Sequence, residues 1–182
     1  MKRIIFATSN EGKMKEIRLI MEDSGYEVVS LKEAGVVADI EENGSTFEEN
    51  AVIKASEIAK LTGELVLADD SGLEVDYLDK APGIYSARFL GEDTDYTVKN
   101  TYILNELEGV PRDKRSARFV CAIALARPDG TSVTRRATIE GYIGYEIRGE
   151  NGFGYDPIFM VPEFDKTTAE LSIDEKNKIS HR

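Results

Sequence analysis

The sequence predicts an α/β protein with a mixed sheet, formed by one domain of two lobes with a cleft between them. Short apolar runs typical of buried strands, KRIIFAT, YEVVSL and LVLAD, alternate with helical patterns in the first half of the chain. Two longer runs, SARFVCAIALA and SVTRRATIEG, flank the turn signal PDG and predict an antiparallel hairpin. Because 182 residues are enough for one core, we assign residues 1–182 to a single domain.

Three segments carry the apolar periodicity of helices. In KMKEIRLIMEDSG, the side chains of Ile17, Ile20 and Met21 share one face and predict a helix after the SNEGK turn. In STFEENAVIKASEIAKLTG, Ser45 and Glu48 form a capping-box pattern at the start of the helix. The third segment is DYTVKNTYILNELEG. Strands and helices therefore alternate along the chain, which is typical of the α/β class.

The net charge of −11 argues against several classes of partner. Such a surface repels nucleic acid and anionic lipid, so we expect no nucleic-acid and no membrane partner. No segment approaches the roughly 18 apolar residues that span a membrane, and the first apolar run is too short for a signal peptide. The single cysteine, Cys121, lies in an apolar run and is expected to be buried. These features predict a cytoplasmic protein.

The segment TSNEGK, from Thr8 to Lys13, is a candidate for phosphate binding because it lies between a predicted strand and a predicted helix. Backbone N–H groups, hydroxyls and the Lys13 ammonium could bind phosphate at the amino terminus of that helix. The segment lacks the spacing of a full phosphate-binding motif, so a capped turn is the alternative.

Acidic residues precede and open the second predicted helix, in DIEENGSTFEEN. Glu41 and Glu42 stand before a flexible Asn-Gly pair and could turn toward a ligand. Asn50 and Lys54 are four residues apart, so one helix face could present an amide and a cation to one ligand. A solvated helix face is the alternative for all four residues.

The segment LADDSGL places Asp69 and Asp70 at the end of a predicted strand, where α/β proteins bind ligands. Successive strand residues point to opposite sides, so one carboxylate can face a cleft. Mg²⁺ takes one or two carboxylates together with water and substrate phosphates. Turn-capping aspartates are the alternative. The only histidine, His181, leaves no multi-histidine metal site.

The segment GENGFGYDPIF places three glycines among aromatic and acidic residues. Gly149, Gly152 and Gly154 would let the backbone approach a ligand closely, and Phe153 and Tyr155 would offer flat faces on which a base could stack. A tight turn anchored by aromatic core residues is the alternative.

Together these segments indicate a nucleotide site, in which a divalent cation bridges the carboxylates to a polyphosphate held by lysines. The same residues, over nearly the whole chain, resemble the inosine triphosphate pyrophosphatases, also called dITP/XTP diphosphatases. The motifs that carry the resemblance are TSNEGKMKEI, EENGSTFEENAVIKA, ADDSGLEVDYL, APGIYSARF, GFGYDPIF and TTAELSIDEKNKISHR. Members of this family usually continue beyond SHR through a further short helix, whereas this sequence stops at Arg182.

The resemblance implies a role for each matching residue. Asp70 matches the general base, and Glu41 and Asp70 match the Mg²⁺ ligands. Ser71 matches a substrate contact, and Lys54 a second phosphate-binding lysine. The triphosphate loop corresponds to Thr8, Ser9, Asn10, Glu11, Gly12 and Lys13. The nucleoside positions correspond to Phe153, Gly154, Tyr155, Asp156, Lys176, His181 and Arg182.

The resemblance also implies the fold and the reaction. The family has an elongated mixed sheet flanked by helices, two lobes with a deep active-site cleft, and a homodimeric assembly. Its activity is Mg²⁺-dependent hydrolysis of non-standard purine nucleotides (ITP, dITP and XTP) to the monophosphate and pyrophosphate, which cleanses the nucleotide pool. A non-catalytic nucleotide sensor and a pyrophosphatase for pyrimidine nucleotides are the alternatives.

Overall fold

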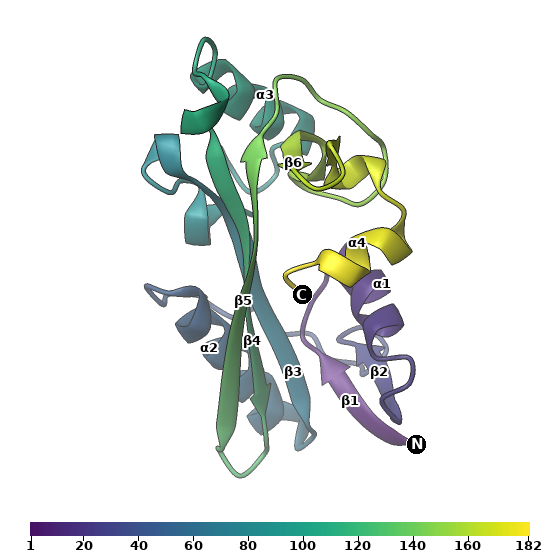
Figure 1. Cartoon of the computed structure of the whole chain (residues 1–182). Coiled ribbons are helices and arrows are strands. Elements are labelled where there is room, and N and C mark those ends of the chain that lie inside the picture. The colour runs from purple at the N-terminus through teal and green to yellow at the C-terminus, as the bar shows by residue number, and fades with distance from the viewer. The chain divides into compact units, whose positions relative to one another are not determined.

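The computed structural model describes all residues, Met1–Arg182, and confirms the α/β class (Figure 1). The strands are β1 (Lys2–Phe6), β2 (Tyr26–Ser30), β3 (Val66–Val75), β4 (Ser116–Ala126), β5 (Ser132–Ile143), β6 (Phe159–Val161) and β7 (Lys166–Thr167). The helices are α1 (Glu11–Ile20), α2 (Phe47–Thr62), α3 (Tyr96–Glu106) and α4 (Ile173–Ile179). No helix is long and apolar enough to cross a membrane.

One seven-stranded sheet has the order β2-β1-β3-β4-β5-β6-β7. Strand β1 pairs in parallel with β2 and β3, whereas β6 pairs antiparallel with β5 and β7, so the predicted mixed sheet is confirmed. Strands β4 and β5 are neighbours, and the turn that joins them is closed by a 2.9 Å hydrogen bond from the Arg127 amide to the Thr131 carbonyl. Cys121 of β4 is buried, as expected, and burial raises the pKa of its thiol to about 12.

The chain forms two compact units, in line with the two predicted lobes. Unit 1 comprises residues 1–70, 121–137 and 182. Unit 2 comprises residues 71–120 and 138–181. The long strands β3, β4 and β5 contribute residues to both units.

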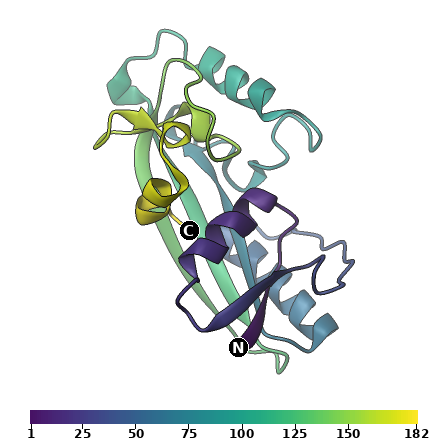
Figure 2. The same ribbon diagram turned by 90° about the vertical axis from the view of Figure 1, so that its right-hand side faces the viewer.

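Unit 1 places α1 and α2 on opposite faces of its part of the sheet (Figure 1, Figure 2). Ile4 and Phe6 of β1 pack with Met14 and Ile17 of α1 in one apolar cluster. Ile20, which was expected on this face, is 42% exposed because Met14 and Ile17, three residues apart, fill the buried stripe. The buried residues of α2 include Ala51, Ala55, Ile58 and Ala59.

Unit 2 has its own core, to which α3 and the second half of β3 contribute. Leu73 and Val75 of β3 cluster with Ile103 of α3, with Leu107 at the end of that helix and with Phe159 of β6. Strands β6 and β7 have three and two residues, and no sequence pattern predicted them. Period-two alternation cannot be recognised over so few positions.

Three sequence-based boundaries are wrong. Helix α1 already begins at Glu11, because the side chain of Asn10 accepts a hydrogen bond from the Lys13 amide and caps it. Helix α2 is capped by Thr46 rather than by Ser45, since the Thr46 side chain accepts from the Glu49 amide. Strand β3 does not end at the aspartate pair but continues without interruption to Val75.

One buried guanidinium holds several loops of unit 2 together. The side chain of Arg115 is among the largest that are fully buried, and no carboxylate pairs with it in the structure. It donates instead to the backbone carbonyls of Leu107, Val110, Ile143 and Gly144. The planar five-donor fork of arginine suits this arrangement, whereas a lysine cannot reproduce it.

We therefore predict that Arg115→Lys destabilises the protein. An ammonium can satisfy only some of these carbonyls, and each buried acceptor left unpaired costs about 1 to 3 kcal/mol. The free energy of unfolding, measured by urea denaturation, should fall by about 3 kcal/mol or more. Arg135→Lys is the matched control, because Arg135 is exposed. Equal stability of the two variants would contradict the structural role of Arg115.

Candidate active site

A buried carboxylate, that of Asp69 on β3, joins three cations of unit 1. Its Oδ1 lies 3.1 Å from Nζ of Lys13, its Oδ2 lies 3.2 Å from Nε of Arg182, and its backbone carbonyl accepts from Nζ of Lys54 at 2.9 Å. The Arg182 guanidinium also pairs with the buried Glu16 of α1. Burial works to raise the pKa of Asp69, but Lys13, Arg182 and Lys54 together hold it well below its usual value. Asp69 is thus the fixed anion of a charged network.

The next residue, Asp70, has the opposite electrostatic character. Its carboxylate is 9% exposed, and its Oδ2 accepts from Nδ2 of Asn50 at 3.3 Å. Burial raises the pKa of Asp70 to about 6, and Glu42 adds to this while Lys54 opposes it. Because Asp69 contacts α1 and Asp70 contacts α2, the two side chains leave opposite faces of the strand, as expected.

Glu42, rather than Glu41, joins this group of charges. Oε1 of Glu42 lies 2.5 Å from Nζ of Lys54, whereas the Glu41 side chain is exposed. Burial works to lower the pKa of Lys54, but Asp69 and Glu42 raise it above its usual value. Glu42 and Asp70 are therefore the carboxylates that influence each other on this side of the sheet.

The chemistry of these donors fits a hard cation. No group of three or more His, Cys, Asp or Glu side chains is arranged to hold a metal ion. Mg²⁺, however, commonly takes only one or two carboxylates and completes its shell with water and substrate phosphates. Glu42 and Asp70 are such a pair, since the charge of each carboxylate interacts with the Lys54 ammonium.

Two lysines accompany these acids: Lys54 pairs with Glu42, and Lys13 and Lys54 both contact Asp69.

The TSNEGK segment forms a capped turn that also borders a pocket of unit 1. Oγ1 of Thr8 accepts from the Asn10 amide, and Oδ1 of Asn10 accepts from the Lys13 amide, both at 3.1 Å. Glu11 and Gly12 lie in the first turn of α1. The pocket, of about 230 Å³, is lined by Ala7, Thr8, Ser9, Leu31, Ala38, Asp39, Ile40, Glu42, Lys54 and Ile58. Thr8 and Ser9 of the predicted phosphate loop therefore border the same cavity as Glu42 and Lys54.

In unit 2 the GFGYD loop is built around the buried carboxylate of Asp156. Its Oδ2 accepts from the Phe153 amide at 2.9 Å and from Nζ of Lys176 at 2.7 Å, and its Oδ1 accepts from Oγ1 of Thr168 at 2.8 Å. A Cβ at Gly152, where φ is +71°, would lie 2.1 Å from Oδ2 of Asp156. The tight-turn alternative is thus realised, and Asp156 and Lys176 shape the loop itself.

The two aromatic residues of the loop differ in their surroundings. Phe153 is half-buried, and Nζ of Lys176 lies 4.6 Å from the centre of its ring. Tyr155 is only 5% exposed, packs edge-on against Tyr96, and donates its hydroxyl to the Ser86 carbonyl at 2.6 Å. The expected flat face of Tyr155 is therefore occupied by the core, whereas that of Phe153 is partly open.

The remaining predicted residues lie in both units. His181, in unit 2, is 9% exposed and stacks on Phe119 of β4 with a ring-centre distance of 5.2 Å. Ser71, also in unit 2, is half-buried on β3 directly after Asp70. Arg182 belongs to unit 1, where its guanidinium is paired with Glu16 and Asp69.

The model of the Ham1 family matches residues 4–182 of this sequence. The chain belongs to the Ham1 family. Among curated relatives, the dITP/XTP pyrophosphatase of Bacillus licheniformis is 55% identical over 182 residues, which is 100% of this chain and 93% of the relative. The dITP/XTP pyrophosphatase of Bacillus subtilis is 53% identical over 182 residues, which is 100% of this chain and 92% of the relative.

Solved Ham1 structures share the fold. The Ham1 protein of Staphylococcus aureus is 45% identical with a TM-score of 0.86, and the match covers 100% of this chain and 92% of that one. A HAM1 protein from Coxiella burnetii is 43% identical with a TM-score of 0.88, covering 100% of this chain and 93% of that one. The seven-stranded α/β fold is therefore that of the Ham1 family.

Three residues that contact the predicted site were missed by sequence reasoning. Glu16 is a charged residue three positions after Lys13 on the buried face of α1, and this spacing was the available signal. Thr168 follows the strand β7 in the TTAEL motif and contacts Asp156. Phe119 is hidden in the apolar run of β4, and nothing in the sequence distinguishes it from other core residues.

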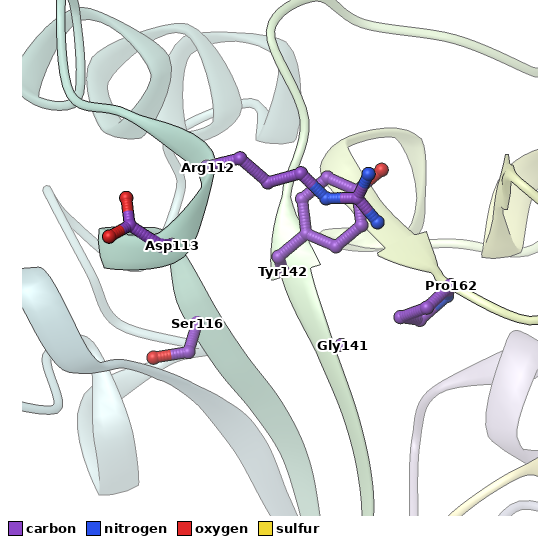
Figure 3. A pocket seen from close by; sticks show the side chains of 6 residues that line it. All are labelled: Arg112, Asp113, Ser116, Gly141, Tyr142 and Pro162. Atoms are coloured by element: carbon purple, nitrogen blue, oxygen red, sulfur yellow. The ribbon is translucent and has the colours of Figure 1, made fainter.

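A second pocket, in unit 2, holds none of the predicted site residues. It has a volume of about 610 Å³ and is lined by Arg112, Asp113, Ser116, Gly141, Tyr142 and Pro162. Figure 3 shows the Arg112 side chain extended over the ring of Tyr142, with 4.3 Å between its guanidinium carbon and the ring centre. The chemistry that the sequence predicts therefore does not involve this pocket.

The raised pKa of Asp70 predicts that Asp70→Asn stabilises the metal-free protein at alkaline pH. An unfolded aspartate has a pKa near 4, so ionisation of Asp70, at about 6 when folded, disfavours the folded state increasingly from about pH 4 to pH 6. The variant should gain about 3 kcal/mol at pH 8 and almost nothing at pH 4.

Urea denaturation in the presence of EDTA, repeated between pH 4 and pH 8, measures this difference. Asp129→Asn is the control, because Asp129 is exposed and hydrogen bonds with Thr131 lower its pKa. A difference between Asp70→Asn and wild type that does not change with pH would contradict the raised pKa.

Proposed function

We propose that this protein is a Mg²⁺-dependent pyrophosphatase that hydrolyses ITP, dITP and XTP to the monophosphate and pyrophosphate, and so cleanses the nucleotide pool. The proposal is carried by one observation, the carboxylate of Asp70, which is buried, has a raised pKa and lies beside lysines and a second acid. Curated relatives with the name dITP/XTP pyrophosphatase, 53% to 55% identical over the full chain, support the choice of substrates.

Asp70 is the proposed general base. It would accept a proton from the water whose oxygen attacks the α-phosphorus, while the bond from that phosphorus to the pyrophosphate oxygen breaks. A base is most effective when its pKa lies near the working pH, and a value of about 6 approaches this condition. Mg²⁺ held by Glu42 and Asp70 would offset the negative charge that develops on the leaving pyrophosphate.

Lys13, Lys54 and the start of α1 are the proposed triphosphate contacts. The amino terminus of a helix attracts anions, and the two ammonium groups add two positive charges beside it. Their present partners are the carboxylates of Asp69 and Glu42, which orient both lysines, and these two acids raise the pKa of Lys54. The two lysines thus supply the local positive charge that binding of a polyphosphate requires in a protein of net charge −11.

The GFGYD loop with Lys176, His181 and Arg182 is the proposed nucleoside site, and Ser71 a further substrate contact. Phe153, whose ring is half-buried, is the residue on which a base would stack. Hypoxanthine and xanthine carry an acceptor oxygen at C6, whereas adenine carries a donor amino group there. Protein donors that face C6 would therefore select hypoxanthine and xanthine over adenine.

Two rival functions are weaker. A nucleotide sensor needs no general base, yet Asp70 is held with a raised pKa. A pyrophosphatase for pyrimidine nucleotides is the enzymatic alternative. We further propose a cytoplasmic homodimer without nucleic-acid or membrane partners, which the family resemblance and the acidic composition support.

The products provide the first test. Incubation with a panel of ITP, dITP, XTP, the four common triphosphates and pyrimidine analogues, followed by chromatography, should give monophosphate and pyrophosphate from the first three. Stepwise release of orthophosphate would indicate a phosphatase instead.

Activity should disappear with EDTA and return with Mg²⁺ or, in part, Mn²⁺. Asp70→Asn should lower turnover by about 10² to 10⁴.

The choice between the two neighbouring acids provides the second test. Glu42→Gln should raise the Mg²⁺ concentration needed for half-maximal activity by about tenfold or more, because a neutral amide is a poorer ligand than a carboxylate. Glu41→Gln is the matched control, since Glu41 is exposed and adjacent in sequence. A larger effect of Glu41→Gln in this metal titration would restore Glu41 as the ligand.

A further inference from the structure

Helix α3 carries a buried amide that no role described so far explains. Asn100 is 2% exposed, and its Nδ2 donates to the backbone carbonyl of Gly154 at 3.1 Å. Its Oδ1 is buried and has no hydrogen-bond partner. The orientation of the amide is set by the carbonyl it faces, because the flipped amide would place two acceptors against each other. A buried acceptor without a partner is costly, so stability alone does not account for an asparagine here.

The bond to Asn100 determines which way one peptide of the GFGYD loop points. Gly154 has a φ of +64°, and its carbonyl is directed at the Asn100 amide. In a trans peptide the C=O and the following N–H point in opposite directions. The amide N–H of Tyr155 is therefore directed away from Asn100, and the hydrogen bonds of the loop give it no acceptor within the protein.

The Tyr155 side chain is anchored from the same helix, so this N–H has a fixed position. The Tyr96 ring meets the Tyr155 ring edge-on at 5.2 Å, and the Tyr155 hydroxyl donates to the Ser86 carbonyl. Lys99, buried beside Asn100, donates to the Ala87 carbonyl at 2.7 Å and lies 4.6 Å from the centre of the Tyr96 ring. Asn100 thus fixes the peptide between Gly154 and Tyr155, and Tyr96 and Ser86 fix the Tyr155 side chain.

We propose that Asn100 is a positioning residue for base selection. By holding the Gly154 carbonyl it presents the Tyr155 N–H as a donor to an acceptor atom of the base, which suits the C6 oxygen of hypoxanthine or xanthine and not the amino group of adenine. The proposal rests on the proposed function of the GFGYD loop, and it places a specificity determinant on helix α3, outside the residues proposed to contact substrate.

The test compares Asn100→Ala and Asn100→Asp with Asn105→Ala, a control on an exposed position of the same helix. For the Asn100 variants, kcat/KM for ITP should fall by about tenfold to a hundredfold, mainly through KM, while that for ATP changes little. Inhibition by tripolyphosphate, which has no base, should keep its wild-type constant. An unchanged ratio of ITP to ATP activity in a folded Asn100 variant would overturn the proposal.

A measurement on the wild-type protein covers the case in which both Asn100 variants fail to fold. In a ¹⁵N-labelled sample, IMP should shift the Tyr155 amide and Asn100 side-chain amide resonances, and pyrophosphate should not. Resonances that do not respond to IMP would overturn the proposal. Wild-type protein that hydrolyses none of ITP, dITP and XTP would instead overturn the proposed function, so the two failures are distinguishable.

Discussion

The buried carboxylate of Asp69 is the interaction on which unit 1 depends. It joins α1, through Lys13, and the terminal Arg182 to the centre of β3, and it also holds Lys54 of α2 through its backbone carbonyl. At the adjacent Asp70, burial and the charge of Glu42 raise the pKa by more than Lys54 and Lys13 lower it. The two carboxylates consequently have pKa values displaced in opposite directions, which is the usual physical basis for a division between structural and chemical roles.

Unit 2 also contains a buried carboxylate with several partners, and this one orders a loop. The pair of Asp156 and Lys176 is buried, and its carboxylate also accepts from the Phe153 amide and from Thr168. A loop of three glycines would otherwise be among the most mobile segments of the chain. Ordered before any ligand arrives, it loses less conformational entropy on binding.

Apolar patterning predicted those parts of the fold that are long enough to show a period. The five-residue strands β1 and β2 and the stripe of α2 were recognised, whereas β6 and β7 are too short. Site residues were recognised where charge or glycine stands out within a motif. Partners that come from distant segments were not: Glu16 and Thr168 acquire their significance only through Arg182 and Asp156, which folding brings to them.

Gly152 shows how tightly the loop restricts its own sequence. A single methyl group there would displace the Asp156 carboxylate, and with it the contacts to Phe153 and Lys176. The positive φ of +71° disfavours any other residue independently of space. Two unrelated penalties thus fall on the same position, and a smaller side chain at Asp156 would relieve only the steric one. In a library of all single substitutions, position 152 should therefore tolerate glycine alone, although it is exposed.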